Sequence, residues 1–417
     1  MTDLNKQSAT YFPNLDGLRF LAFLLVFVNH VVATLGHKTV NPLVNKIKTD
    51  YLLNGDLGVN FFFVLSGFLI TYLLLKEKEQ HSTINVKSFY LRRVLRIWPL
   101  YFLVLFIGLA VIPLFTTALP PRFPILTSTA TLDKNLYMFF LGNFDYVKNG
   151  ISNAIVGVLW SVSIEEQFYL FWPLLLLIIL RKHLTKLFIV LIAFSVYYRL
   201  FGMSGKTQNL MQHYHTFSCI SDLAMGALFA KLCDSEKFIN FFRRLNPVVI
   251  ILVYLVGLFL IAIRMDLFHL ELTQNEYLKQ INFRSNGIKP RPLQYWRSFM
   301  PVVYSLFFAF VMMEQIFSER SVFKIGKIKL FTYLGKISYG LYCFHMIALF
   351  IVVYVMMKLG YSVTLPDKNL IIFEAFSALA LTIIISILSY YFFEKRFLLL
   401  KGKIAANLSP KAAKKKK

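Results

Sequence analysis

Acidic residues are scarce in this sequence of 417 residues, where 21 Asp and Glu stand against 45 Lys and Arg. Charged residues make up only 16% of the chain and hydrophobic residues 57%, with a mean hydropathy of +0.60. So little charge excludes an ordinary soluble domain. A basic excess also occurs in nucleic-acid-binding proteins. Here, however, the basic residues lie between apolar runs, so we expect contact with a lipid bilayer and no nucleic-acid partner.

Cysteine is rarer still, with three residues in the chain. Cys219, Cys233 and Cys343 all fall in apolar segments, and none has the spacing of metal ligands. We interpret them as small buried hydrophobic residues. A P-loop and a Rossmann glycine pattern are also absent from the sequence. We therefore expect no metal site and no permanently bound cofactor.

Long apolar runs dominate what is present. A helix needs about 20 mainly apolar residues to cross the hydrocarbon core of a membrane. Scanning with that length predicts an all-α polytopic bundle of about ten transmembrane helices. The expected spans are residues 18–36, 57–75, 98–118, 157–180, 187–203, 217–233, 248–265, 298–317, 331–357 and 370–393. The run 136–144 is too short to span, and we expect a re-entrant or interfacial piece there.

The basic residues predict the orientation of this bundle. Most of the 45 Lys and Arg fall in the segments that are cytoplasmic if both termini are cytoplasmic, as the positive-inside rule requires. The first run follows a polar leader without a cleavage site, so we interpret it as a signal anchor. We expect a membrane domain over residues 1–397 and a basic cytoplasmic tail over residues 398–417.

The first span carries an ionisable ring in "NLDGLRFLAFLLVFVNHVVATL". His30 lies 11 residues after Arg19, which places both on one helix face about 16 Å apart along the axis. An ionisable group at membrane depth costs at least ~2.5 kcal/mol and is commonly functional. The alternative is a cytoplasmic anchor at Arg19 and a hydrogen-bonded core residue at His30. Asp16 and Asn14 precede the predicted helix, where they could cap it.

Two further stretches carry polar residues at span ends. In "GVNFFFVLSGFLIT", Ser66 and its neighbouring glycine would let another helix or a ligand approach closely. In "SFYLRRVLRIWPLY", Arg93 and Arg96 are three residues apart and share a helix face. Paired guanidinium groups suit phosphate oxygens. Simple packing at Ser66 and an ordinary positive-inside cluster at the arginines are the alternatives.

The strongest anomaly is "GVLWSVSIEEQFYLFWPLLLLIIL". Glu165 and Glu166 enter an apolar helix, and adjacent residues point about 100° apart, so the two acids cannot face one partner equally. An interfacial helix start with exposed acids is the alternative. That alternative does not explain why the aromatic residues Trp160 and Tyr169 lie in the same stretch.

The ninth span begins "LGKISYGLYCFHMIALF". Ser338, Tyr342 and His345 lie at positions i, i+4 and i+7, which form one continuous polar stripe. Two imidazoles and two carboxylates therefore belong to one predicted bundle. A histidine can take up and return a proton near neutral pH, and a carboxylate can orient its ring.

Taken together, these stretches resemble the acyltransferase-3 family of integral membrane acyltransferases. This family includes bacterial O-antigen and other polysaccharide O-acetyltransferases. The resemblance covers nearly the whole chain, and its motifs occur in the family's order. The matching pieces are "LDGLRFLAFLLVFVNH", "GVNFFFVLSGFLIT", "FYLRRVLRIWPLY", "LWSVSIEEQFYLFWPLL" and "LGKISYGLYCFH". Family members commonly have ten spans and cytoplasmic termini.

The resemblance implies roles for several residues. His30 matches the family's proposed catalytic histidine, and Arg19 matches its partner arginine in the D-G-L-R stretch. Arg93 and Arg96 match the R-x-x-R motif, which we expect to bind the donor.

The fourth span and the ninth also match. Glu165, Glu166 and Tyr169 match the E-E-Q-F-Y core, and His345 matches a histidine after the S-Y-x-L-Y stretch. Some family members carry a fused extracytoplasmic domain that finishes the transfer. We expect none here, so either a one-component reaction or a separate extracytoplasmic partner protein would complete it.

The resemblance thus predicts an acyltransferase of the bacterial inner (plasma) membrane. It would move an acyl group, most simply acetyl, from cytoplasmic acyl-CoA to a hydroxyl of a cell-surface or lipid-linked glycan. His30 would remove the hydroxyl proton or carry the acyl group, and Glu165 or Glu166 would steady the imidazolium. Acetyl-CoA is a donor substrate in this scheme. A proton-coupled secondary transporter and a glycan flippase are the alternatives.

Overall fold

The computed structural model describes residues 12–35, 55–118, 131–150, 153–202, 207–273, 292–361 and 368–400. Within these ranges the chain is almost entirely helical and contains no β-strand, so the predicted all-α class is confirmed. Most of the predicted tail, residues 401–417, lies outside the described residues. The cytoplasmic location of both termini and the boundary at residue 397 stay predictions.

Long helices form the body of the molecule, and every predicted span overlaps one of them. They are α1 (Pro13–Leu35), α3 (Gly55–His81), α4 (Val86–Phe106), α9 (Leu159–Ile178), α10 (Leu184–Phe201), α12 (Thr216–Leu232), α14 (Pro247–Thr273), α16 (Pro292–Phe317), α18 (Ser338–Lys358) and α19 (Lys368–Ser389).

Shorter elements connect or extend these helices. The short α-helices are α6 (Lys134–Met138), α7 (Gly142–Asn149), α8 (Ala154–Gly157), α11 (Gln208–Tyr214), α13 (Glu236–Arg243) and α17 (Lys329–Lys336). The 3-10 and π-helical turns are η2 (Ile107–Val111), η3 (Ile112–Ala118), η4 (Arg181–His183), η5 (Ile325–Lys327) and η6 (Tyr390–Glu394).

Length and hydropathy identify a polytopic membrane bundle. In the described part of the chain, eight helices are long and apolar enough to cross a membrane. A ninth span is formed if α12 and α13, which meet at a bend of 99°, are taken together. The predicted span 248–265 falls on α14, whose apolar part, Pro247–Ala262, is shorter than a full span. The predicted span 331–357 begins too early, because residues 331–336 belong to the separate helix α17.

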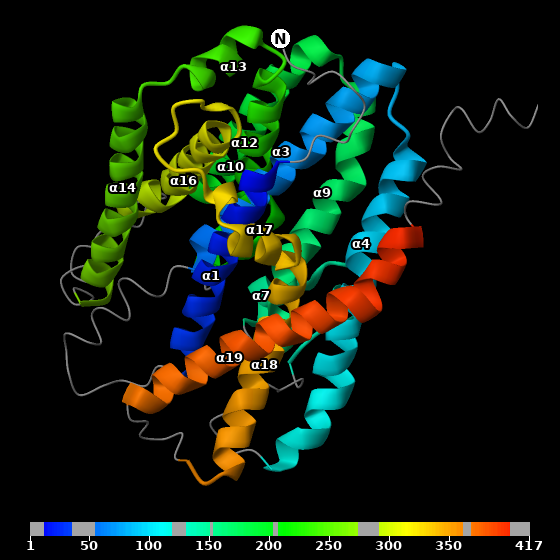
Figure 1. The fold of residues 1–417 in the computed structure, drawn as a ribbon, viewed down its shortest axis with the longest axis vertical. Helices are drawn as coiled ribbons and strands as arrows, with labels where there is room; N and C mark the ends of the chain where they lie inside the picture. The colour runs from blue at the N-terminus through cyan, green and yellow to red at the C-terminus, as the bar shows by residue number, and fades with distance from the viewer. Residues whose placement is uncertain are drawn as a thin grey trace, which may run out of the picture.

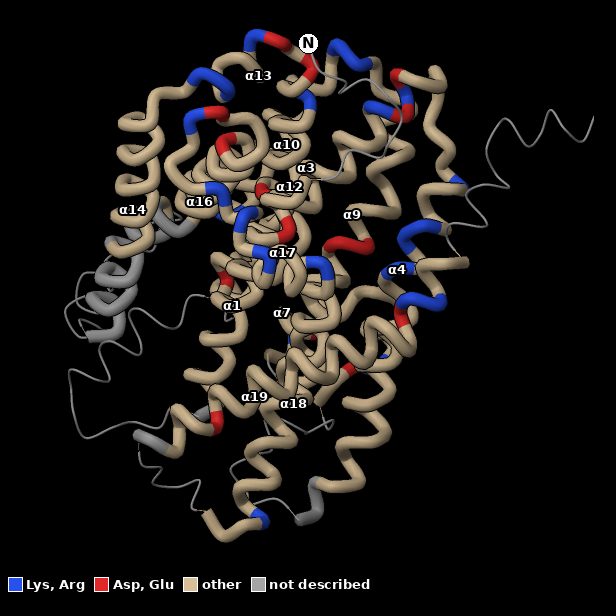
Figure 2. Tube along the Cα trace, in the orientation of Figure 1, with Lys and Arg blue, Asp and Glu red and all other residues tan. Residues whose placement is uncertain are grey.

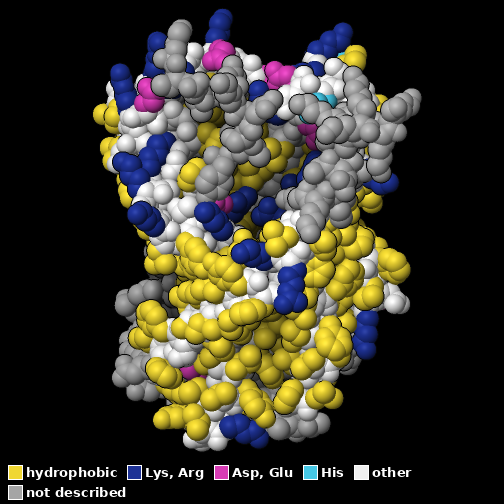
Figure 3. All heavy atoms as spheres, turned by 45° about the vertical axis from the view of Figure 1, so that its right-hand side comes forward, with side chains coloured by type: hydrophobic (Ala, Val, Ile, Leu, Met, Phe, Trp, Pro, Cys, Tyr) yellow, Lys and Arg dark blue, Asp and Glu magenta, His cyan; other side chains and the backbone are white. Residues whose placement is uncertain are grey.

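The outer surface of the bundle suits lipid. Many large hydrophobic side chains are exposed on the long helices, among them Phe171, Ile178, Phe259 and Phe376. Figure 3 shows hydrophobic side chains as a broad yellow band on one face of the molecule, below a recess that is bordered by Lys and Arg side chains. In Figure 2 the basic residues gather at the end of the bundle that carries α13 and along α4, while the described residues at the opposite end include few charged ones.

Helix α3 lies at the centre of the bundle. It packs against α1, α9, α12 and α16, while α18 packs against α1 and α19. Figure 1 shows α19 crossing α18 diagonally. Because α1 and α3 run antiparallel, the end of α1 near Asn29 meets the start of α3 at Gly55. This arrangement brings polar residues of the first span beside those of the second.

The crossing of α3 and α12 depends on two glycines. A Cβ added to Gly67 would lie 1.9 Å from the Leu223 carbonyl oxygen, and a Cβ on Gly226 would lie 1.9 Å from the Val64 oxygen. No side chain fits in that space, so the two backbones touch directly. The contact fixes the position of Ser66, which precedes Gly67 in the chain.

The segment predicted as re-entrant or interfacial, residues 136–144, lies against α9, with Tyr137 and Asn143 buried and Met138 and Phe139 exposed. It forms α6 and the start of α7. The Gln167 amide of α9 donates to the Phe140 carbonyl at 2.9 Å and to Asn143 Oδ1 at 2.8 Å. Asn143 is fully buried. This segment therefore fills the space beside the middle of α9.

Helix α1 begins earlier than predicted, at Pro13. Asn14 and Asp16 consequently lie in its first turn and do not cap it from outside, because Pro is well tolerated at the first helical position. Asn14 instead bonds across the fold to the Gln315 carbonyl at 2.6 Å and the Gly326 amide at 2.8 Å. These two hydrogen bonds hold the start of α1 against α16 and η5.

Candidate active site

Five helices enclose a cavity of about 180 Å³ that contains most of the predicted polar residues. It is lined from α1 by Arg19, from α3 by residues including Val59, Phe62, Ser66 and Leu73, from α4 by Arg93, Arg96 and Ile97, from α9 by Ser161, Val162, Glu165 and Tyr169, and from α18 by Ser338, Tyr339 and Tyr342. Its α3 lining runs from Val59 to Leu73, a length of about 21 Å along the helix. The cavity is therefore an elongated channel beside α3.

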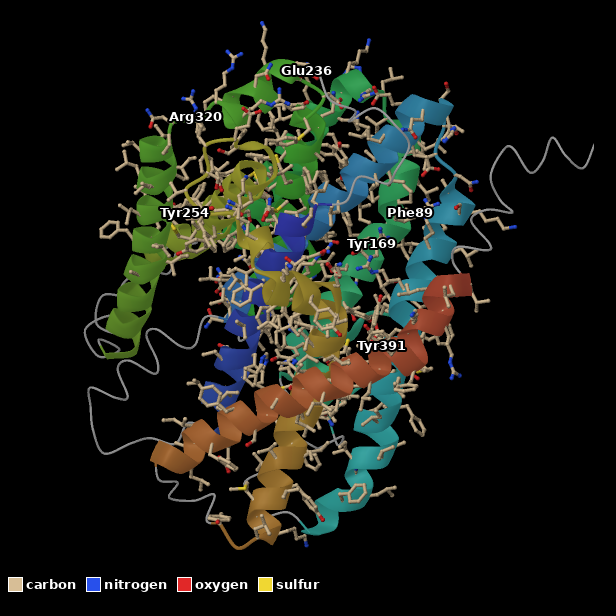
Figure 4. The ribbon with its side chains drawn as sticks, in the orientation of Figure 1. Phe89, Tyr169, Glu236, Tyr254, Arg320 and Tyr391 are labelled. Atoms are coloured by element: carbon tan, nitrogen blue, oxygen red, sulfur yellow. The ribbon has the colours of Figure 1, made fainter. Side chains whose placement is uncertain are left out.

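Three arginines from two helices converge on this cavity. Arg19 pairs with Asp16 of the preceding turn at 2.5 Å. The Arg93 guanidinium lies between two aromatic rings, 5.6 Å from the centroid of Phe89 and 5.4 Å from that of Tyr169. Figure 4 labels both rings, which come from the neighbouring helices α4 and α9. Arg96 is exposed and lines the cavity beside them.

The Arg93 side chain has a hydrogen-bond donor, Nε, that the described residues leave unpaired. Its Nε is buried and has no hydrogen-bond partner among the described residues. Adjacent Arg92 differs, because it pairs with Ser88 at 2.5 Å and with Glu77 at 3.3 Å and does not line the cavity. Helix α4 thus directs Arg93 toward the cavity and the preceding Arg92 toward Ser88 and Glu77.

The two adjacent acids of α9 point in different directions, as the helix period predicts. Glu165 lines the cavity and faces Ser66, Arg93 and Arg96. Glu166 accepts a hydrogen bond from the Trp98 indole at 2.8 Å. The question left open by the sequence, which acid faces the cavity, is thereby answered in favour of Glu165.

A short polar contact joins α3 to α9 at this level. The Ser66 and Tyr169 hydroxyls lie 2.5 Å apart in a buried position. Tyr169 therefore contacts Ser66 through its hydroxyl and Arg93 through its ring. The close crossing at Gly67 holds α3 in the place that this contact requires.

The two predicted histidines lie together. His345 Nε2 is 3.3 Å from His30 Nδ1, and the ring centroids are 4.9 Å apart. His30 Nδ1 also lies 2.9 Å from the Val26 carbonyl oxygen, and His345 Nδ1 lies 2.6 Å from the Tyr342 carbonyl oxygen. His345 is almost completely buried.

These contacts correct one detail of the expected mechanism. We expected Glu165 or Glu166 beside the His30 ring, but the ring's hydrogen-bond partners among the described residues are Val26 and His345. Neither histidine lines the cavity. The acids of α9 face the arginines and Trp98 because α9 approaches α4, while α1 and α18 bring the histidines together.

Tyr342 separates the cavity from the histidine pair. Its ring lines the cavity and lies 5.8 Å from the His345 ring. Its hydroxyl donates to the Val158 carbonyl at 3.0 Å and lies 2.6 Å from the Ser161 hydroxyl. One of the residues that line the cavity thus adjoins the histidine pair.

A model of the family described as "Acyltransferase domain" matches residues 12–391. The chain belongs to this family. All the predicted site residues, from Asp16 to His345, fall within the match. The acyltransferase identification and the expected resemblance are thereby confirmed.

Curated relatives of this acyltransferase are similar over much of its length. The peptidoglycan O-acetyltransferase OatA of Listeria monocytogenes is 28% identical over 60% of this chain and 37% of that protein. A putative O-acetyltransferase of Staphylococcus aureus (strain COL) is 27% identical over 93% of this chain and 57% of that protein. The O-acetyltransferase OatA of Staphylococcus aureus (strain NCTC 8325) is 26% identical, covering 81% and 50%. The acyltransferase chain thus spans 57% or less of these relatives' lengths, and no solved structure matches it significantly.

Two predicted residues of the acyltransferase lie at the margins of the site. Ser338 lines the cavity at the start of α18. Trp160 does not line it, and its ring packs edge-on against Tyr214 at 4.7 Å and Phe63 at 6.1 Å. Trp160 therefore packs between α3, α9 and α11.

Sequence reasoning did not assign Ser161 and Tyr342 of the acyltransferase to the site. Both belong to the helices that carry the E-E-Q-F-Y and S-Y-x-L-Y stretches, at one helical turn from Glu165 and Ser338 respectively. That spacing was the available signal. Among the residues that the structure describes, no group of three or more His, Cys, Asp or Glu side chains could hold a metal ion.

Proposed function

We propose that this chain transfers an acyl group, most simply acetyl, from cytoplasmic acyl-CoA to a hydroxyl of a cell-surface or lipid-linked glycan. The observation that carries the proposal is the convergence of Arg19, Arg93 and Arg96 on one elongated cavity. Tyr342 lines that cavity, and its ring centroid lies 5.8 Å from that of His345, which contacts His30. The printed names of the relatives, peptidoglycan O-acetyltransferase and O-acetyltransferase, support the same reaction class.

The donor binds at the arginine end of the cavity. Planar guanidinium groups bind phosphate oxygens in two parallel hydrogen bonds, and the buried Nε of Arg93 is a donor without a protein partner among the described residues. Acyl-CoA carries its phosphates at one end and its thioester at the end of a long flexible arm. The length of about 21 Å along α3 lets such an arm run from the arginines toward the histidines.

His30 acts as the base in the transfer step. Its ring nitrogen takes the proton of the acceptor hydroxyl while the hydroxyl oxygen attacks the thioester carbonyl. The carbon–sulfur bond then breaks, and the proton passes from His30 to the departing thiolate. General base assistance of this kind contributes roughly 10²–10⁴ in rate. Glu165 stays on the donor side, where it lines the cavity together with Arg93 and Arg96.

The acceptor reaches the histidines from the opposite face. We place the α13 end of the bundle, where the basic residues gather (Figure 2), in the cytoplasm of a bacterial inner membrane. The glycan then approaches on the outer face, directly or through a separate extracytoplasmic partner protein. The histidine pair lies within the bundle because donor and acceptor come from opposite sides.

The test uses purified protein in lipid nanodiscs with radiolabelled acetyl-CoA and a glycan acceptor. The parental protein is expected to release CoA and label the glycan, and His30→Ala is expected to lose at least roughly 100-fold in rate. His81→Ala is the matched control, because His81 is exposed at the end of α3. A correctly inserted His30→Ala variant that retains the parental rate, or a parental protein that transports acetyl-CoA without hydrolysis or transfer, refutes the proposal.

A further inference from the structure

The protons on the two histidine rings can be assigned from their neighbours. A carbonyl oxygen only accepts hydrogen bonds, so a ring nitrogen beside one must carry the proton. His30 Nδ1 lies 2.9 Å from the Val26 oxygen, and His345 Nδ1 lies 2.6 Å from the Tyr342 oxygen. Both rings therefore carry their proton on Nδ1 when they are neutral.

This assignment gives the contact between the rings a direction. With its proton on Nδ1, neutral His345 has a bare Nε2, and that nitrogen lies 3.3 Å from His30 Nδ1. The Nδ1–H group of His30 consequently donates to two acceptors, the Val26 oxygen and His345 Nε2. The remaining nitrogen of neutral His30, Nε2, then carries a lone pair and no proton.

We propose that His345 is a positioning residue that holds His30 in the tautomer whose Nε2 is the base. The proposal rests on the proposed function for its catalytic consequence. His345 Nε2 accepts the Nδ1–H of His30 and stabilises the positive charge that develops when Nε2 takes up the hydroxyl proton. His345, as a neutral ring, thus has the role that an aspartate has in the triad of a serine hydrolase.

The position of His345 within the membrane bundle explains why the acceptor for His30 is an imidazole and not a carboxylate. An ionised carboxylate at membrane depth costs at least ~2.5 kcal/mol, whereas a neutral imidazole avoids that cost. The His345 ring is held in place by its bond to Tyr342 and by the edge of Phe23, whose centroid lies 6.1 Å away. Its orientation is therefore fixed by the packing of α1 against α18.

The first test reads the tautomer without measuring activity. Protein labelled with ¹⁵N-histidine is reconstituted in lipid, and the His30 signals are identified by their loss in His30→Gln. We expect a protonated Nδ1 and a bare Nε2 on His30 at a pH where both rings are neutral. A protonated Nε2 with a bare Nδ1 on His30 overturns the inference, whatever the enzyme's substrate.

The second test replaces the acceptor nitrogen. His345→Phe keeps a ring of similar bulk but offers no lone pair, whereas His345→Gln keeps an acceptor near the position of Nε2. For His345→Phe we expect kcat to fall roughly 10- to 100-fold, with the KM for acetyl-CoA within about twofold because His345 does not line the cavity. His345→Gln is expected to recover part of that loss.

The outcomes separate this inference from the proposed function. An active parental protein whose His345→Phe variant keeps the parental kcat overturns the role of His345 alone. An inactive parental protein overturns the proposed function, while the tautomer test still decides the proton assignment. If His345→Phe does not elute as a single species in detergent, His345→Gln and the labelled spectrum are used instead. A His30 tautomer and a kcat that are both unchanged in His345→Gln support the role of an acceptor at position 345. A bare Nδ1 on His30 of the parental protein refutes that role.

Discussion

The Arg93 guanidinium lies 5.4 Å from the centroid of the Tyr169 ring, and the Tyr169 hydroxyl lies 2.5 Å from the Ser66 hydroxyl. Three helices thus meet at one tyrosine. A cation over an aromatic face gains about 0.5–2 kcal/mol, depending on its exposure to water. The contact orients the plane of the guanidinium before any donor arrives.

Arg93→Lys is expected to raise the KM for acyl-CoA roughly 5- to 30-fold, because lysine keeps the charge but loses about 1–2 kcal/mol of stacking and paired hydrogen bonding. Steady-state kinetics over a range of acetyl-CoA concentrations measure the change. Arg92→Lys is the control, since Arg92 pairs with Glu77 outside the cavity, and its KM should stay near the parental value. Equal increases in the two variants would show that Arg93 contributes only general positive charge.

Glu165→Gln and Glu166→Gln are expected to differ. Glu165 lines the cavity beside Arg93 and Arg96, so we expect that replacing its carboxyl group lowers kcat/KM roughly 10- to 150-fold. Glu166 accepts from Trp98, and a glutamine oxygen can accept the same bond, so the loss should stay below about threefold. Parallel transfer assays check this, and a larger loss for Glu166→Gln would reverse our assignment of the acid that faces the cavity.

Gly226→Ala is expected to lower the stability of the bundle by about 1–3 kcal/mol, because the new methyl group would meet the Val64 oxygen at 1.9 Å. Unfolding in detergent, followed by the exposure of buried cysteine to a fluorescent thiol reagent, measures the loss. Gly157→Ala provides the comparison, since its methyl group would meet only Tyr146, at an ordinary 3.5 Å. Similar unfolding temperatures for both variants would contradict a direct backbone contact between α3 and α12.

Asp234 follows the end of α12 and connects it to η4, the turn that precedes α10. Burial opposes its ionisation, but hydrogen bonds from Arg181 and Lys231 outweigh burial and hold the pKa of Asp234 below its usual value. A carboxyl group with a depressed pKa stabilises the fold above its unfolded-state pKa of about 3.9, and the contribution disappears as the pH falls through the folded-state pKa.

Asp234→Asn should therefore lower the unfolding temperature at pH 7, and the difference should shrink as the pH falls below about 4. Because the pair is partly exposed and screened by solvent, the loss should not exceed about 1 kcal/mol. Thermal unfolding of both proteins across this pH range measures it. A difference that persists unchanged in acid would show that the asparagine acts through packing and not through charge.

Apolar length and basic flanks were sufficient to predict the helices of this bundle. The boundaries were less predictable where a short helix adjoins a span. The run 331–357 reads as one apolar segment, but the chain turns at Ile337 and separates α17 from α18. Hydropathy averages over such a turn, whereas the backbone direction depends on the packing of α17 against α1.

The sequence motifs predicted several polar residues of the cavity, among them Arg93 and Glu165, but not how the side chains pair. The motifs indicated His30, His345 and Glu165 correctly as members of one bundle, and the helix period indicated that Glu165 and Glu166 diverge. Which carboxylate or ring meets His30 depends on which helices are neighbours in space. The sequence of a single chain contains no signal for the contact between residues 30 and 345, which are separated by most of its length.

The acceptor that Val26 presents to His30 is a peptide oxygen, and every amino acid supplies the same atom at that place. Substituting the side chain at position 26 leaves this bond intact as long as the helical turn persists. One of the two acceptors that hold the His30 ring, the Val26 oxygen, therefore cannot be identified by comparing side chains among relatives. Only a change in the backbone itself, such as a single ester linkage in place of that peptide bond, would weaken it selectively.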